Sequence, residues 1–151
     1  MTTRKRVVLV AIDGSDHAEY ALNWYLDNVH RPNDVVIGVH SADYSKLQSQ
    51  PLTLLSSDKS LITNFLETEE ESVKKLAANF ESKVLKNQID GKFIRINGDP
   101  GPGIVEVSNN EKAAVIVMGS RGLGTIRRTL LGSVSSYIMY HASVPVIVCR
   151  Q

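Results

Sequence analysis

Five apolar stretches recur along the chain. Four of them are short, nearly continuous apolar runs. The remaining one, the third along the chain, alternates apolar and polar positions. Such short runs are typical of strands that are buried on both faces of a parallel sheet. The pattern therefore predicts strands at residues 7–12, 35–39, 92–96, 113–118 and 144–149.

Segments with apolar positions three and four residues apart separate these strands. They predict helices that begin after Ser15 and near Ser133, and helices that cover about residues 61–87 and 104–112. The alternation of strands and helices indicates the α/β class, with an open, doubly wound sheet of five parallel strands and helices on both faces. Residues 42–60 have no clear period and are interpreted as a long connection.

The charge balance of the chain excludes several kinds of partner. Lys and Arg number 17 against 16 Asp and Glu, so the net charge is +1 over 151 residues. That balance gives no overall attraction to nucleic acid or to a membrane surface, and any anion site must be local. The length is typical of one domain, and residues 1–151 are expected to fold as one.

Cysteine content and hydropathy exclude further kinds of site and indicate where the protein is located. Cys149 is the only cysteine, so neither an intrachain disulfide nor a metal site built on cysteine pairs can form. No apolar stretch approaches the ~20 residues that span a bilayer, and the run at residues 7–12 is too short for the core of a signal peptide. We therefore expect a cytoplasmic protein.

A glycine-spaced segment carries the clearest candidate chemistry. Gly119, Gly122 and Gly124 follow the predicted fourth strand, and Gly132-Ser133 precedes the next predicted helix. Glycine lets the backbone approach a ligand without a Cβ in the way, and a helix N-terminus offers free N–H groups and a favourable dipole. The spacing fits a phosphate cradle, although glycines after a parallel strand are also common as plain turn residues. It matches neither the Walker A loop nor the dinucleotide fingerprint that follows a first strand.

A second polar loop, Asp13-Gly14-Ser15, follows the first predicted strand. Ligands of such sheets bind beyond the carboxyl ends of strands, where the strand order reverses. If strands one and four are neighbours, both loops border one crevice, and Asp13 either contacts the ligand or acts as a turn or capping residue. His40 ends the second strand, where it is packed or hydrogen-bonded or else touches ligand, whereas His17 is expected on a helix surface.

Several motifs combine along nearly the whole chain, namely Gly119-x-x-Gly122 followed after nine residues by Gly132-Ser133, residues 8–15, Val39-His40 and residues 98–100. Together they resemble the universal stress protein family. The resemblance implies a sheet with strand order 3-2-1-4-5, usually in a homodimer. In the ATP-binding members it also implies a nucleotide held in the crevice above strands one and four.

The resemblance further implies which residues hold the nucleotide. Asp13 would hydrogen-bond the ribose, and the backbone around Ala11 and Ser41 would line and pair with adenine. Family members often carry an apolar residue in place of Ser41, a departure that bears on the adenine side and not on the phosphate cradle. A Mg²⁺ bridging phosphate oxygens is expected. Main-chain N–H groups and one hydroxyl would cradle the phosphates at Met118, Gly119, Gly122, Gly132, Ser133 and Val134.

The resulting expectation is an ATP-binding module of stress response or signalling that is at most a slow ATPase. Fast phosphoryl transfer needs a positioned lysine, a metal-holding carboxylate and a group that orients the attacking water, and beyond Asp13 none stands out in the sequence. Two other classes stay open. One is a dimeric scaffold or chaperone-like protein that binds no nucleotide. The other is a nucleotide-activating, adenylyl-transfer enzyme of related fold, although 151 residues leave no room for a substrate domain.

The last predicted strand also predicts an interface. Pro145 near its start indicates a sheet edge, where a missing N–H does no harm. An exposed apolar edge invites pairing with another chain. We therefore predict a homodimer through antiparallel pairing of residues 144–150, in agreement with the dimer that the resemblance implies.

Overall fold

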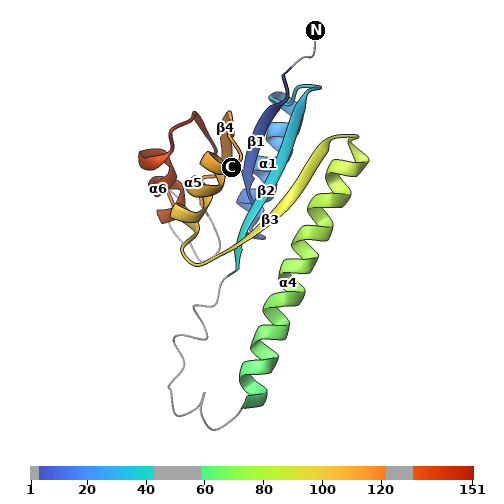
Figure 1. The fold of residues 1–151 in the computed structure, drawn as a ribbon, viewed down its shortest axis with the longest axis vertical. Coiled ribbons are helices and arrows are strands. Elements are labelled where there is room, and N and C mark those ends of the chain that lie inside the picture. The colour runs from blue at the N-terminus through green and yellow to red at the C-terminus, as the bar shows by residue number, and fades with distance from the viewer. Residues whose placement is uncertain (1–3, 43–58, 122–130) are drawn as a thin grey trace.

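A sheet of five parallel strands forms the centre of the molecule (Figure 1). The computed structural model describes residues 4–42, 59–121 and 131–151. The strand order is β3-β2-β1-β4-β5, which confirms the predicted fold class and order. The strands are β1 (Arg6–Ala11), β2 (Asp34–Ala42), β3 (Asp90–Asn97), β4 (Val115–Gly119) and β5 (Val146–Cys149).

Helices cover both faces of this sheet, as predicted. The pair α1 (Asp16–Asn28) and α4 (Lys59–Lys86) packs on one face, and the pair α5 (Pro100–Asn110) and α6 (Ser133–His141) packs on the other. The 28-residue helix α4 runs alongside β3 (Figure 1). Within the three described ranges, none of the helices combines the length and the apolar character that a membrane crossing needs.

Successive residues of each inner strand fill two separate cores. In β1, Val8 belongs to a buried cluster with Tyr25 and Phe80, whereas Leu9 belongs to the opposite cluster with Ile138. Side chains alternate between the faces of a strand, and here both faces are covered. This arrangement explains why β1 is a continuous apolar run in the sequence instead of an alternating one.

Several element boundaries differ from the predicted ones by a few residues, and those of α5, β2 and β3 differ for clear physical reasons. Apolar spacing predicted α5 only from about residue 104, but it begins at Pro100 with Asp99 as N-cap, as the Asp99-Pro100 pair in the sequence predicts, because proline suits a first helical position. Strands β2 and β3 pair in register from Val35 opposite Asp90 to Ala42 opposite Asn97. Both strands therefore extend beyond their apolar centres, since backbone pairing sets their ends.

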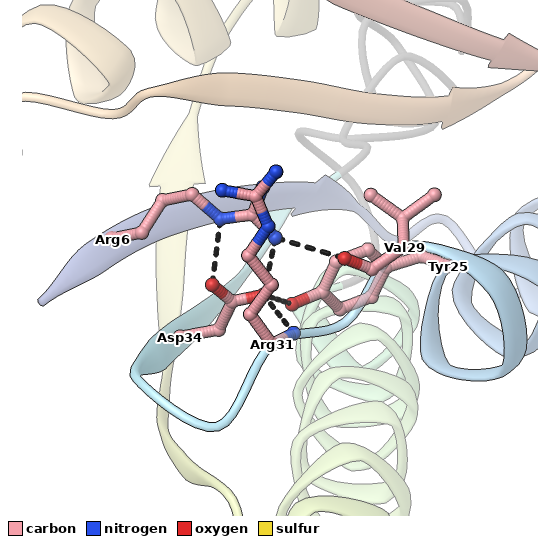
Figure 2. Close-up of polar contacts among 5 residues, drawn as sticks. All are labelled: Arg6, Tyr25, Val29, Arg31 and Asp34. Carbon is pink, nitrogen blue, oxygen red and sulfur yellow. Dashed lines mark hydrogen bonds and ion pairs between the residues drawn. The ribbon is translucent and has the colours of Figure 1, made fainter.

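A buried polar network ties the amino ends of β1 and β2 to α1 (Figure 2). Arg6 donates from Nε and Nη2 to the two carboxylate oxygens of Asp34, at 2.6 and 2.7 Å, and from Nη2 to the carbonyl oxygen of Val29 at 2.9 Å. The Tyr25 hydroxyl and the Arg31 backbone N–H both donate to Asp34 Oδ2. The Asp34 side chain is fully buried, so these protein groups take the place of its hydration.

The protonation states in this network follow from the same contacts. Burial by itself would raise the pKa of Asp34, but hydrogen bonds from Arg6, Tyr25 and the Arg31 backbone outweigh it and hold that pKa below its usual value. Burial, reinforced by the Asp34 contact, raises the pKa of Tyr25. Asp34 is therefore the charged acceptor and Tyr25 a protonated donor at neutral pH. The network lies at the amino ends of the strands, opposite the edge where ligands of such sheets bind.

Candidate functional site

The carboxyl edge of the sheet brings the two predicted loops together. Strands β1 and β4 are neighbours, with Val10 paired to Val117. Consequently the loop that begins after Ala11 and the segment that begins at Gly119 leave the sheet side by side. This is also the position where the strand order reverses. Met118, which precedes Gly119, has a buried side chain, so a ligand at this edge would meet its backbone.

Asp13 is held in place by Ser15. The Ser15 backbone N–H and hydroxyl donate to Asp13 Oδ1 at 2.9 and 2.5 Å. Between them Gly14 has φ of +84°, a conformation that favours glycine. Ser15 also caps α1, because its Oγ accepts from the Ala18 N–H at 3.1 Å. Asp13 therefore has a turn-forming role, and a carboxylate that accepts about four hydrogen bonds retains capacity for a ligand.

Hydrogen bonds close the two ends of the glycine segment on each other. The Gly132 N–H donates to the Ser120 carbonyl oxygen at 2.9 Å, and the Ser135 hydroxyl donates to the Gly119 carbonyl oxygen at 2.9 Å. The Ser120 N–H in turn donates to the Cys149 carbonyl oxygen of β5 at 3.0 Å. These contacts place the start of α6 directly at the end of β4. Gly122, a further predicted phosphate contact, lies outside the described residues.

The N-terminus of α6 has no side-chain cap. Its N-cap is Gly132, so no side chain there accepts from the first-turn N–H groups. The N–H groups of the first residues, Ser133 and Val134 among them, have no intrahelical acceptor. Ser133 is exposed. This end of α6 is therefore a set of hydrogen-bond donors with a favourable dipole for an anion.

Gly119 and Gly132 differ in what the fold demands of them. A Cβ at Gly119 would lie 2.7 Å from both the carbonyl carbon and the oxygen of His17, so the close packing of α1 on β4 already demands glycine there. Gly132 has φ of −63° and ψ of 160°, which any residue adopts. His17 on α1 is partly exposed, as a helix-surface residue would be, but its Nδ1 is enclosed in the protein.

Strand β2 continues past the end of β1. The Ile12 N–H donates to the Val39 carbonyl oxygen at 2.8 Å, and β2 then runs on to Ala42 beside β3 alone. Peptide groups two residues apart in a strand point to the same side, so the N–H and C=O of Ser41 face the space above β1. The Ser41 hydroxyl donates to the Gly98 carbonyl oxygen at 2.7 Å and is thereby turned to the β3 side.

His40 is enclosed at the same edge. The residue is 9% exposed, and its ring stacks on Phe93 with centroids 6.4 Å apart and places Nδ1 2.7 Å from the Ile12 carbonyl oxygen. The expectation that His40 is packed or hydrogen-bonded at the strand end is confirmed.

A groove of about 810 Å³ also runs between α1 and α4. Lys83 crosses it to reach Glu19 and Asn23. The groove lies on one face of the sheet and its rim mixes acidic and basic side chains, so it does not present the local positive field that a phosphate needs. In the described part of the chain, no group of three or more His, Cys, Asp or Glu side chains could hold a metal ion.

Comparisons with known proteins agree with this architecture. The stress response protein NhaX of Bacillus subtilis is 26% identical over 160 residues, spanning 95% of this chain and 96% of NhaX. Universal stress protein MJ0577 of Methanocaldococcus jannaschii is 26% identical over 159 residues, spanning 100% of this chain and 98% of MJ0577. Its solved structure matches with a TM-score of 0.78 over 97% of this chain and 96% of that chain.

Two further solved structures share the fold at lower identity. An Arabidopsis thaliana universal stress protein family protein with AMP bound matches with a TM-score of 0.71 at 20% identity, over 97% of this chain and 92% of that chain. A universal stress protein in complex with cAMP matches with a TM-score of 0.58 at 22% identity, over 98% of both chains. The model of the universal stress protein family matches residues 5–150. This chain therefore belongs to the universal stress protein family.

Proposed function

We propose that this chain binds an adenine nucleotide, ATP in particular, in the crevice above β1 and β4. The observation that carries the proposal is the uncapped N-terminus of α6, which hydrogen bonds hold at the carboxyl end of β4. Two proteins of the same fold hold AMP and cAMP, which supports an adenine nucleotide as the ligand.

The phosphates would bind at the α6 end of the crevice. There the N–H groups of Ser133 and Val134 and the Ser133 hydroxyl are donors, and the backbone at Met118 and Gly119 borders the same space. Gly132 needs no special backbone conformation, and its missing Cβ would leave room for a ligand to come close. Gly122 belongs to this proposal through the sequence motif. A Mg²⁺ would be carried on the phosphate oxygens.

The nucleoside would bind toward β1 and β2. Adenine offers one donor and one acceptor side by side, which matches the paired C=O and N–H of Ser41 that face the space above β1. The backbone at Ala11 would line the base. The Asp13 carboxylate would accept from a ribose hydroxyl, a charge-assisted hydrogen bond.

The function proposed for the bound nucleotide is signalling, with hydrolysis slow at most. Rapid phosphoryl transfer uses a positioned lysine, a metal-holding carboxylate and a group that orients water. Among the described residues at this edge, Asp13 supplies a carboxylate, and its Oδ1 is already engaged by Ser15. The nucleotide would therefore set the conformation of the carboxyl edge that a partner in a stress response recognises.

Mass spectrometry of acid-extracted, purified protein tests this function. We expect an adenine nucleotide at close to one per chain, or uptake to that level after incubation with ATP and Mg²⁺, because the crevice offers donors for base, ribose and phosphate together. GTP in place of ATP is the control, since guanine reverses the donor and acceptor positions that Ser41 would pair with. Protein that takes up neither nucleotide would favour the non-nucleotide scaffold instead.

We also propose a homodimer through residues 144–150, because β5 is an edge strand of the sheet. The carbonyl oxygens of Pro145 and Cys149 accept from Ile116 of β4 and from Ser120 just after it, so the N–H of Val148 points away from the sheet, where a partner strand would pair. Val148→Pro should convert a dimer into a monomer of 16.6 kDa in size-exclusion chromatography with light scattering. Val148→Ala keeps the N–H and should stay dimeric. A wild-type monomer at micromolar concentration would refute the interface.

A further inference from the structure

His40 makes a hydrogen bond that bears directly on the conformation of Asp13. A carbonyl oxygen only accepts, so at 2.7 Å from the Ile12 oxygen the His40 Nδ1 is the donor and carries a proton. That carbonyl belongs to the peptide bond between Ile12 and Asp13. The contact therefore fixes the peptide plane from which the Asp13 side chain starts.

The same peptide segment is held from three sides. The Ile12 N–H donates to the Val39 carbonyl oxygen at 2.8 Å, and the Asp13 carboxylate accepts from Ser15. The ring of His40 is itself fixed, since the residue is 9% exposed and the ring is stacked on Phe93. His40 therefore links β2 rigidly to the peptide between Ile12 and Asp13, at the start of the loop that follows β1.

Packing beside Phe93 alone would need no particular ring nitrogen. An apolar side chain would fill the same space beside Phe93, and the Ile12 carbonyl would then lose its donor at a point where β1 has left the sheet. The placement of Nδ1 on the last carbonyl before Asp13 indicates a more specific role.

We propose that His40 is a positioning residue that sets the Asp13 carboxylate for a ribose hydroxyl, and so gives the site its preference for ribonucleotides. This inference rests on the proposed adenine-nucleotide site. A hydrogen bond to a charged acceptor corresponds to a preference of about tenfold for ATP over the deoxynucleotide that lacks the bonded hydroxyl. Without the His40 donor the Ile12–Asp13 peptide can turn, the carboxylate moves with it while keeping its Ser15 hydrogen bonds, and the preference falls to less than about threefold.

The test compares dissociation constants of ATP, 2′-deoxy-ATP and 3′-deoxy-ATP for matched variants. His40→Leu removes the donor. His40→Asn keeps one, because an asparagine amide nitrogen reaches the position of Nδ1, and it should keep the ribose preference. His40→Gln, whose amide reaches the position of Nε2 instead, should lose that preference and replaces the leucine variant if the latter does not fold. Far-ultraviolet circular dichroism confirms that each variant is folded.

The outcomes separate this inference from the proposed function. Ribose preference that is lost in His40→Leu and kept in His40→Asn supports the positioning role, most strongly if His40→Leu has no further effect in an Asp13→Ala background. Wild-type protein with no affinity for any of the three nucleotides overturns the site itself. Wild-type protein that binds ATP with a ribose preference that His40→Leu leaves intact overturns only the role of His40.

Discussion

Replacement of Asp34 by asparagine is expected to lower the free energy of unfolding by about 3 kcal/mol at pH 7. Asp34 is fully buried and its two oxygens accept from Arg6, Tyr25 and the Arg31 backbone. An asparagine would present an amide in place of one of these acceptors and would leave the Arg6 charge without its counter-ion. Breaking one partner of a buried ion pair is far more destabilising than its net contribution suggests, because the remaining charge is not solvated.

Urea denaturation followed by circular dichroism measures this loss. Asp90→Asn is the matched control, because it removes the same charge from an ion pair with Lys5 in which both side chains are about two-thirds exposed. Such a surface pair contributes less than about 1 kcal/mol. Equal losses in the two variants would contradict the structural importance assigned to the buried network.

The loss of stability in Asp34→Asn should depend on pH. The pKa of Asp34 in the folded protein lies below its usual value, which is about 3.9. Its charge therefore contributes stability in full well above pH 4, and that contribution is lost as pH falls through the folded-state pKa. The difference between wild type and Asp34→Asn should be largest near neutral pH and should shrink below about pH 4. A constant difference from pH 7 to pH 3 would assign the loss to packing and not to charge.

Apolar patterning predicted the sheet well for a physical reason. A strand such as β1, covered by helices on both faces, has few positions that can hold a polar side chain. Its burial can therefore be predicted from a continuous run of apolar residues. The ends of β2 and β3 were not predictable in this way. They are set by backbone pairing between Ala42 and Asn97, which does not depend on side-chain polarity.

The Arg6–Asp34 network was missed because its members are 28 positions apart and each looks like an ordinary surface residue next to a strand. Only the parallel pairing of Arg6 with Asp34 in β1 and β2 brings them together. A register argument could have found them, since both precede the apolar runs by one residue.

The candidate site was predictable at the level of loops and not of individual contacts. Adjacent strands β1 and β4 brought Asp13 and Gly119 to one edge, as the topology required. Nothing in the sequence indicated that Gly119 packs against the backbone of His17, or that His40 donates to the Ile12 carbonyl. Both are contacts between distant segments at close range, which residue spacing along a chain does not encode.

Gly132→Val is expected to weaken ATP binding at least about 100-fold. This is the largest effect that we expect on ligand binding. The backbone conformation at Gly132 is open to valine, and loss of the glycine N-cap should lower the free energy of unfolding by only about 1 kcal/mol, so the fold should persist. The new side chain would occupy the space that a phosphate needs in order to reach the N–H groups of Ser133 and Val134. Loss of two charge-assisted hydrogen bonds corresponds to at least this factor.

Two other variants serve as controls for that experiment. Ser133→Ala removes one hydroxyl donor and should weaken binding by only about tenfold. Gly119→Ala would place a Cβ 2.7 Å from the His17 backbone and should lower the free energy of unfolding by about 2 kcal/mol. A binding defect in Gly119→Ala would therefore reflect the fold as well as the ligand, whereas one in Gly132→Val reflects the ligand.

Isothermal titration of nucleotide-free wild-type protein and of Gly132→Val with ATP and Mg²⁺ tests the central claim most directly. The proposed site predicts saturable binding of one ATP per wild-type chain and a dissociation constant at least about 100-fold higher for the Gly132→Val protein, measured well below its melting temperature. Absence of binding heat and of any ATP-dependent rise in melting temperature for the wild type, or equal affinity in the two proteins, would contradict a phosphate site at the N-terminus of α6.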